Sequence, residues 1–154
     1  PHYIDTHVRN LMKPGVACTF SLWSFIPDKR HSRLGLWLYE CLRDLHLSIQ
    51  AIKRPELCVR GMTFGFNTEL GRLFGFRTDI RRGEDGSLAL AMKPYGRLIF
   101  ITSRKARALT SNSTIDADGS LARSFGVRLL KALKGATGLL YKKTTYKDKD
   151  SNLL

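Results

Sequence analysis

Three basic side chains cluster where an apolar stretch of the sequence gives way to an amphipathic one. Lys29, Arg30 and Arg33 would surround the first turn of a helix that begins near residue 33. The first N–H groups of a helix lack intrahelical acceptors and carry the positive end of its dipole, so this end binds phosphate. Ser32 is suited to cap the helix, and Gly35 would let a ligand approach the backbone closely. This spacing predicts a pyrophosphate site.

The same loop also fits a simpler interpretation. Basic residues between a strand and a helix are often only solvated, and a phosphate-binding loop usually contains more glycine than this one. His31 would either contact the phosphate or be another solvated loop residue. The residues alone leave both interpretations open.

A strand before the loop and a helix after it must position these side chains. Apolar residues alternate from residue 17 and slip by one position at Leu22-Trp23. The slip predicts a strand over residues 17–26 that either contains a β-bulge or is buried on both faces. Residues 33–48 place apolar side chains at helical spacing and charged ones off that stripe, which predicts an amphipathic helix.

A second strand and helix follow. Residues 57–66 predict a strand, and Asn67 is a good N-cap for a short helix over residues 68–74 that ends at Gly75. Glu69 is a candidate general base, and its alternative role is to stabilise the first turn of this helix through the dipole.

The rest of the chain predicts short strands and one basic helix. Strands are expected at residues 77–82, 87–92 and 97–102, with turns at 83–86 and 94–96. Residues 103–119 predict a polar loop, residues 120–134 a basic amphipathic helix, and residues 142–154 a flexible Lys-rich tail. The expected fold class is a mixed α/β domain.

The loop and the second strand and helix together resemble the GNAT superfamily of acyl-CoA-dependent N-acyltransferases. The signature of that family, Arg/Gln-x-x-Gly-x-Gly/Ala at the start of a helix, is similar to Arg30-His31-Ser32-Arg33-Leu34-Gly35. Ile26-Pro27-Asp28 looks like its Val-x-Pro lead-in, and Asn67 and Gly75-Phe76 are similar to its later Asn and Leu-Gly-Phe positions. Ser21-Leu22-Trp23 looks most like the branch that acts on amino-sugars in polysaccharide synthesis.

The resemblance implies a fold, a reaction and a cofactor. The fold would be a GNAT-like central mixed sheet flanked by helices, with residues 1–141 as one domain (core 16–102, extension 103–141). The reaction would transfer an acyl group from acetyl-CoA, or another acyl-CoA, to a small amine such as an amino-sugar, without a metal. The implied cofactor-binding residues are Arg30, His31, Ser32, Arg33, Leu34, Gly35, Trp23 and Asn67. The slip at Leu22-Trp23 lies where the family has a split between strands that presents a backbone N–H to the thioester carbonyl.

The chain departs from the family pattern at identifiable positions. Arg33 replaces the first glycine of the signature, and Phe74 stands where relatives often hold a tyrosine acid. Phenylalanine has no proton to donate. The family also places a strand, two helices and two more strands ahead of this segment, whereas residues 1–15 are all that precede it here. These departures favour a second hypothesis, a catalytically degenerate GNAT-like fold.

The formal charge of +13 supports a third hypothesis, a non-enzymatic nucleic-acid-binding protein. Nucleic acid or an anionic membrane could meet the basic helix at 120–134, whose charges would otherwise be solvated. The three cysteines are sparse and widely spaced, which favours a reducing, cytoplasmic location over a disulfide scaffold. The start, Pro1-His2-Tyr3, has no signal-peptide pattern and no initiator Met, so we expect a processed chain or a fragment.

Overall fold

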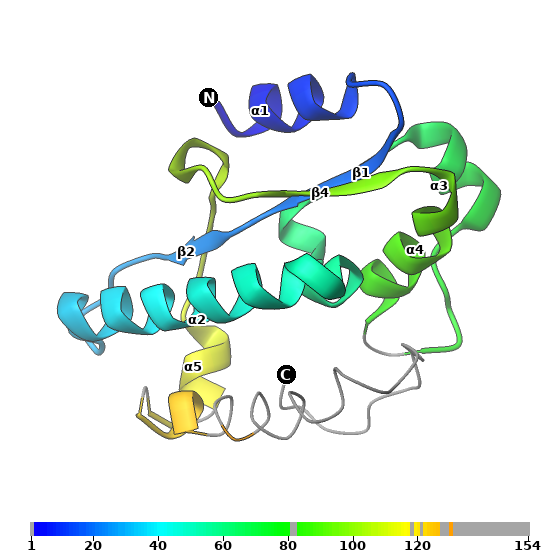
Figure 1. Cartoon of the computed structure of the whole chain (residues 1–154). Coiled ribbons are helices and arrows are strands. Elements are labelled where there is room, and N and C mark those ends of the chain that lie inside the picture. Colours follow the sequence, from blue (N-terminus) through cyan, green and yellow to red (C-terminus); the bar gives the residue numbers. More distant parts are fainter. Residues whose placement is uncertain (1, 81–82, 118, 121, 127–129, 131–154) are drawn as a thin grey trace.

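The computed structural model describes residues 2–80, 83–117, 119–120, 122–126 and 130 (Figure 1). The helices are α1 (His2–Leu11), α2 (Arg33–Lys53), α3 (Thr68–Phe74), α4 (Glu84–Met92) and α5 (Ser113–Ala117). The strands are β1 (Val16–Ser21), β2 (Trp23–Phe25), β3 (Phe64–Phe66), β4 (Arg97–Ile101) and β5 (Ala108–Thr110). Short 3-10 turns are η1 (Pro55–Cys58), η2 (Gly61–Thr63), η3 (Lys93–Tyr95) and η4 (Arg104–Ala106). The predicted mixed α/β class is confirmed.

The strands form two small sheets that share one continuous stretch of chain. In the first sheet, β1 lies between β3, to which it is antiparallel, and β4, to which it is parallel. In the second sheet, β2 pairs in parallel with β5. The strand predicted over residues 17–26 therefore exists, but it divides at Leu22 as the chain passes from one sheet to the other. All of β1 is buried, so burial on both faces, and not a bulge at Leu22, explains the lost alternation. The register shift in β1 lies earlier, between Val16 and Cys18.

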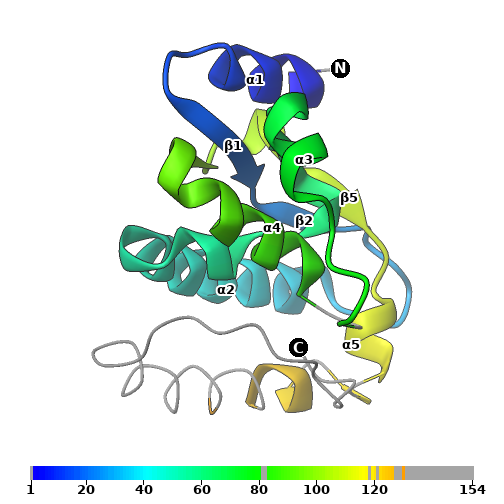
Figure 2. The ribbon, with the colours of Figure 1, turned by 90° about the vertical axis from the view of Figure 1, so that its right-hand side faces the viewer.

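Helices cover both faces of the first sheet. Figures 1 and 2 show α1 on one side of β1, and α2 and α4 on the other. Phe20 of β1 stacks on Phe100 of β4 with ring centroids 5.2 Å apart. Leu88 and Met92 of α4 are fully buried in the core, and Tyr39 contributes from α2. The core therefore lies beneath β1, between the sheet and these two helices.

Local signals predicted several elements correctly. The helix expected at residues 33–48 is α2, which continues to Lys53. Asn67 caps α3 as expected, and α3 ends at Gly75, whose φ of +62° suits a residue without a side chain. The strand expected at 97–102 is β4, after the turn at 94–96.

Other predictions were wrong, mainly where a short apolar run was read as a strand. Residues 87–92 belong to α4, which starts at Glu84 within the predicted turn, because Leu, Ala and Met favour a helix and bury against the core. Only residues 64–66 of the strand expected at 57–66 are β; Pro55 and Gly61 begin 3-10 turns instead. Residues 77–80 form no strand, and 81–82 lie outside the described residues.

The remaining differences concern the two ends of the chain. Helix α1 was not predicted, since its one buried side chain is the polar His7. The polar loop expected at 103–119 contains η4, β5 and α5. Of the helix expected at 120–134, residues 122–126 and 130 are helical, and the other residues beyond 120 lie outside the described part, as does the predicted tail at 142–154. Among the described helices, none has the length and apolar character needed to cross a bilayer.

Candidate anion-binding site

The loop before α2 is closed by its own carboxylate. Asp28 Oδ1 accepts hydrogen bonds from the N–H groups of Arg30 (3.0 Å) and His31 (2.8 Å). Asn112 Nδ2 donates to Asp28 Oδ2 (2.7 Å), and His31 Nδ1 lies 3.0 Å from Oδ1. The hydrogen bond from Asn112, and next those from the side chain and N–H of His31, lower the pKa of Asp28 to about 2. Two backbone N–H groups expected to hold a phosphate thus already bind an internal anion.

The start of α2 still offers donors to a ligand. Ser32 caps the helix as predicted, because its Oγ accepts from the N–H of Gly35 at 2.9 Å. The first intrahelical bond runs from Leu36 N–H to Ser32 O (3.0 Å). The N–H groups of Arg33 and Leu34 therefore lie at the helix start without intrahelical acceptors. Any anion bound here would meet these two groups instead of those of the preceding loop.

The basic side chains expected around the helix start are accessible. Lys29, Arg30 and Arg33 are all exposed, and Leu34 is 74 % exposed beside them. In contrast, the His31 ring is mostly covered and lies between two carboxylates, with Nε2 3.7 Å from Asp116 Oδ1. His31 therefore connects the loop to α5.

Trp23 lies inside the molecule. Its side chain is 7 % exposed, and the Arg43 guanidinium lies over its ring at 4.3 Å from the centroid. Arg43 Nη2 also donates to the Trp23 carbonyl oxygen at 2.5 Å. Both the ring and the carbonyl oxygen of Trp23 are therefore engaged within the core, and the structure does not bring this residue to the surface of the loop.

Asn67 and Glu69 lie far from the loop. Figure 1 shows the start of α2 and helix α3 at opposite ends of the molecule. The Asn67 side-chain oxygen accepts from the N–H groups of Glu69 and Leu70, and the Asn67 N–H donates to Ala17 O at 2.9 Å. Asn67 thus positions α3 against β1. Glu69 is exposed in the first turn of α3, where its charge is also favourable to the helix dipole.

A partly buried charge network holds α2 at the angle that presents its start. Glu40 accepts from the N–H of Phe25 (2.7 Å) and from Ser24 Oγ (3.0 Å). Arg107, just before β5, pairs with Asp44 (2.6 Å) and with Glu40 (3.6 Å). These contacts join α2 to both strands of the second sheet, so the loop between β2 and α2 spans two fixed points.

Sequence reasoning missed three residues near the candidate positions. Asn112 and Asp116 come from a segment expected to be loop, and only tertiary contact brings them to Asp28 and His31. Tyr95 packs its ring against Phe74, with centroids 5.1 Å apart, and is 60 % exposed. A phenol side chain therefore packs against Phe74, which has no hydroxyl of its own. The pairing of an aspartate with a histidine three residues later was a local signal for the closed loop; nothing local pointed to Tyr95.

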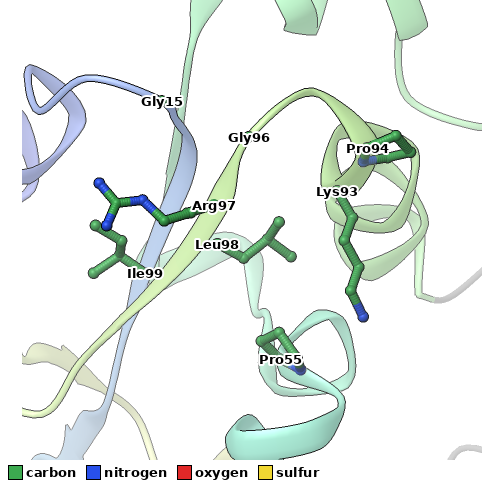
Figure 3. A pocket seen from close by; sticks show the side chains of 8 residues that line it. All are labelled: Gly15, Pro55, Lys93, Pro94, Gly96, Arg97, Leu98 and Ile99. Atoms are coloured by element: carbon green, nitrogen blue, oxygen red, sulfur yellow. The ribbon is translucent and has the colours of Figure 1, made fainter.

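A shallow depression lies at the other end of the first sheet (Figure 3). Its volume is about 510 Å³, and it is lined by Gly15, Pro55, Lys93, Pro94, Gly96, Arg97, Leu98 and Ile99. Gly15 and Gly96 precede the parallel strands β1 and β4. The depression therefore lies at the N-terminal ends of these strands, whereas the loop follows their C-terminal ends. Lys93 Nζ is held by the buried Glu56 at 3.0 Å. The depression is thus separate from the predicted anion site.

No protein-family model, curated protein or solved structure matches this chain. In the part of the chain that the structure describes, no three His, Cys, Asp or Glu side chains are grouped so that they could hold a metal ion.

Proposed function

We propose that this chain is an acyl-CoA-dependent N-acyltransferase of the GNAT type, acting on a small amine. The observation that carries the proposal is the start of α2. Ser32 caps the helix there while the N–H groups of Arg33 and Leu34 stay without intrahelical acceptors, and three exposed basic side chains surround them. This donor set suits the diphosphate of CoA, because it combines helix-end N–H groups with full positive charges.

The arrangement of the strands is consistent with this proposal. The long pantetheine arm of CoA separates its diphosphate from its thioester, so catalytic groups need not adjoin the loop. The chain passes from the first sheet to the second at Leu22, between the loop and α3. We place the acyl group beyond this division, beside α3, which carries Glu69 and packs against Tyr95 through Phe74. The resemblance of Ser21-Leu22-Trp23 suggests an amino-sugar as the amine.

Two side chains would manage the protons of acyl transfer. Bound acyl-CoA would supply the activated acyl group, and the amine nitrogen would bond to its carbonyl carbon as the C–S bond breaks. Glu69 would accept the proton from the amine, and the Tyr95 phenol beside Phe74 would donate a proton to the departing sulfur. Since a thiol titrates only slightly above neutral pH, this second transfer is a modest requirement.

A non-catalytic binding module is the second candidate, and one observation favours it. Asp28 occupies the N–H groups of Arg30 and His31 and places a carboxylate next to the proposed diphosphate. A loop closed in this way would bind CoA more weakly. The chain would then be a degenerate GNAT-like fold that binds anionic ligands without catalysing acyl transfer. Nucleic acid is a further polyanion that the same basic side chains would attract.

Calorimetric titration with acetyl-CoA tests the proposal. We expect binding that weakens about tenfold in Arg33→Ala, since one charge-assisted contact is lost. Arg104→Ala is the matched control, because Arg104 is equally exposed but lies in η4, away from the loop. Absence of both heat and a thermal shift at millimolar acetyl-CoA would overturn CoA binding. Binding without acyl transfer to any amine tested would favour the second candidate.

An oligonucleotide titration distinguishes nucleic-acid binding from acyltransferase activity. The nucleic-acid alternative predicts tighter binding to the oligonucleotide than to CoA, with a steep salt dependence and equal losses in Arg33→Ala and Arg104→Ala. Acyltransferase activity predicts the opposite order of affinity and a loss confined to Arg33→Ala.

A further inference from the structure

Helix α2 carries a continuous row of exposed apolar side chains. The row runs the length of the helix, with exposed fractions between 38 % at Leu42 and 81 % at Ile52. We call it the α2 stripe; it consists of Leu34, Leu38, Leu42, Leu45, Ile49 and Ile52. Scattered exposed leucines are normal, whereas a contiguous apolar patch over several helical turns marks an interaction surface.

The fold does not use the α2 stripe for its own core. The core side of α2 is formed by Leu36, Tyr39 and Leu47, which are all at most 5 % exposed. Trp37, which is 53 % exposed, and the exposed Cys41 flank the stripe on the same outer side of the helix.

The charges of α2 are sorted between its two sides. Its acidic residues, Glu40 and Asp44, are partly buried and engaged by β2 and by Arg107. The basic side chains left exposed on α2 are Arg33, His46 and Lys53. Lys29 and Arg30 extend this positive character just before the helix. The outer side thus combines an apolar row with cations at both ends and no carboxylate.

We propose that the α2 stripe binds the surface of an anionic lipid bilayer, with α2 lying parallel to the membrane plane. The leucines and isoleucines would insert among the upper acyl chains, Trp37 would lie at headgroup depth, and Arg33 and Lys53 would contact lipid phosphates. A wide apolar face with basic residues and a tryptophan is the pattern of interfacial helices. Each cation near an anionic leaflet adds attraction, so the two kinds of contact reinforce each other.

Charge complementarity favours a bilayer over two other possible occupants of the α2 stripe, a second copy of the chain and residues 131–154. In a pair of copies, parallel or antiparallel, the ends with Arg33 or Lys53 would face further positive charge, and each copy carries a formal +13. Residues 131–154 of the chain also have more lysines than aspartates. A membrane with anionic headgroups supplies the opposite charge along the whole helix. This inference does not rest on the proposed enzymatic function, although both use Arg33 as a phosphate contact.

Co-sedimentation with vesicles tests the inference on the full chain. The vesicles are phosphatidylcholine alone and phosphatidylcholine with phosphatidylserine. We expect binding to the mixed vesicles, and a partition coefficient lower by about tenfold or more in the double variant Leu38→Ser/Leu45→Ser. Ile4→Ser/Met12→Ser is the matched control, because those side chains are at least as exposed as Leu38 and Leu45 but belong to α1 and its C-terminal end, across the sheet. The control should bind as the unmodified chain does.

Alkylation of Cys41 gives a second readout at the same surface. Cys41 is the exposed cysteine, while Cys18 and Cys58 are buried, so a thiol reagent reports on the α2 stripe. We expect mixed vesicles to slow its alkylation severalfold and phosphatidylcholine vesicles to have much less effect. A thermal melt of each variant confirms that the substituted chains remain folded.

Several outcomes would overturn the inference. One is no binding of the unmodified chain to the mixed vesicles; another is an equal loss of binding in the two double variants. If Leu38→Ser/Leu45→Ser instead converts a concentration-dependent dimer to a monomer while vesicle binding is unchanged, the α2 stripe joins two copies of the chain. If Cys41 is protected without vesicles in a monomer, another part of the chain covers the stripe.

Discussion

His7 is a buried residue whose ionisation should control stability in mildly acidic solution. Ser21 Oγ donates to Ala106 O at 2.6 Å, so it accepts from His7 Nε2. Thr19 Oγ1 lies 2.8 Å from His7 Nδ1 and 3.5 Å from Gly65 O, so the shorter contact takes its proton and Nδ1 accepts. Both ring nitrogens are therefore matched by a neutral imidazole. Burial lowers the pKa of His7 from its usual 6.5. The unfolded chain consequently binds a proton more readily than the folded one.

We predict that the free energy of unfolding falls as pH decreases from about 6.5 through the lower, folded pKa of His7. Above that window the contribution is complete. Urea titrations at several pH values measure it, and His7→Gln should reduce the slope. The exposed His46→Gln is the control and should keep the slope of the unmodified chain. Equal slopes in both variants would show that another group is responsible.

At the same scale, we expect Asp28 to stabilise the fold while it weakens the binding of an anion at the candidate site. Asp28→Ala would free the N–H groups of Arg30 and His31 and remove a negative charge from the candidate site. We expect severalfold tighter binding of acetyl-CoA together with a lower melting temperature, measured by calorimetry and thermal shift. Asp5→Ala, an exposed change on α1, should alter neither. Weaker CoA binding in Asp28→Ala would mean that the closed loop is required for the site.

At the scale of elements, the cap of α3 is a test of how local sequence determines structure. Asn67 accepts from two N–H groups at the start of α3, and its replacement by Ala should cost about 1 kcal/mol of unfolding free energy. Asn67→Asp should retain most of the stability, because a carboxylate also accepts these bonds and suits the helix dipole. Urea denaturation measures both. Equal losses in the two variants would show that Asn67 matters through another contact.

The caps also explain which elements were predictable. Ser32, Asn67 and Gly75 act on neighbours within a few residues, so α2 and α3 follow from short stretches of sequence. Residues 87–92 lacked such a decisive signal, because a short apolar run fits a buried strand as well as a buried helix. The burial of Leu88 and Met92 against the rest of the core decided for α4. The candidate site shows the same limit: the bond from Asn112 to Asp28 joins residues 84 apart in the chain.

At the scale of the whole molecule, α2 is held to the second sheet by charge as well as by apolar contact. Arg107 lies beside β5 and pairs with Asp44 and Glu40 of α2, and all three side chains are about 15 % exposed. Arg43 lies against Trp23 in β2 and also bonds Asp44, so the network extends to the other strand of the second sheet. The long helix that presents both the candidate anion site and the α2 stripe is thus fixed to the strands through these pairs.

Arg107→Met should therefore destabilise the whole fold. The substitution keeps much of the side-chain volume but leaves partly buried carboxylates with fewer partners, and losing such charge-assisted hydrogen bonds typically costs about 1.5–3 kcal/mol. We expect a lower midpoint of urea denaturation with a single transition, since α2 and the second sheet would lose their connection together. Arg77→Met is the control, because Arg77 pairs with the exposed Asp79 and such exposed pairs contribute little. A midpoint in Arg107→Met no lower than in Arg77→Met would show that apolar packing alone holds α2 in place.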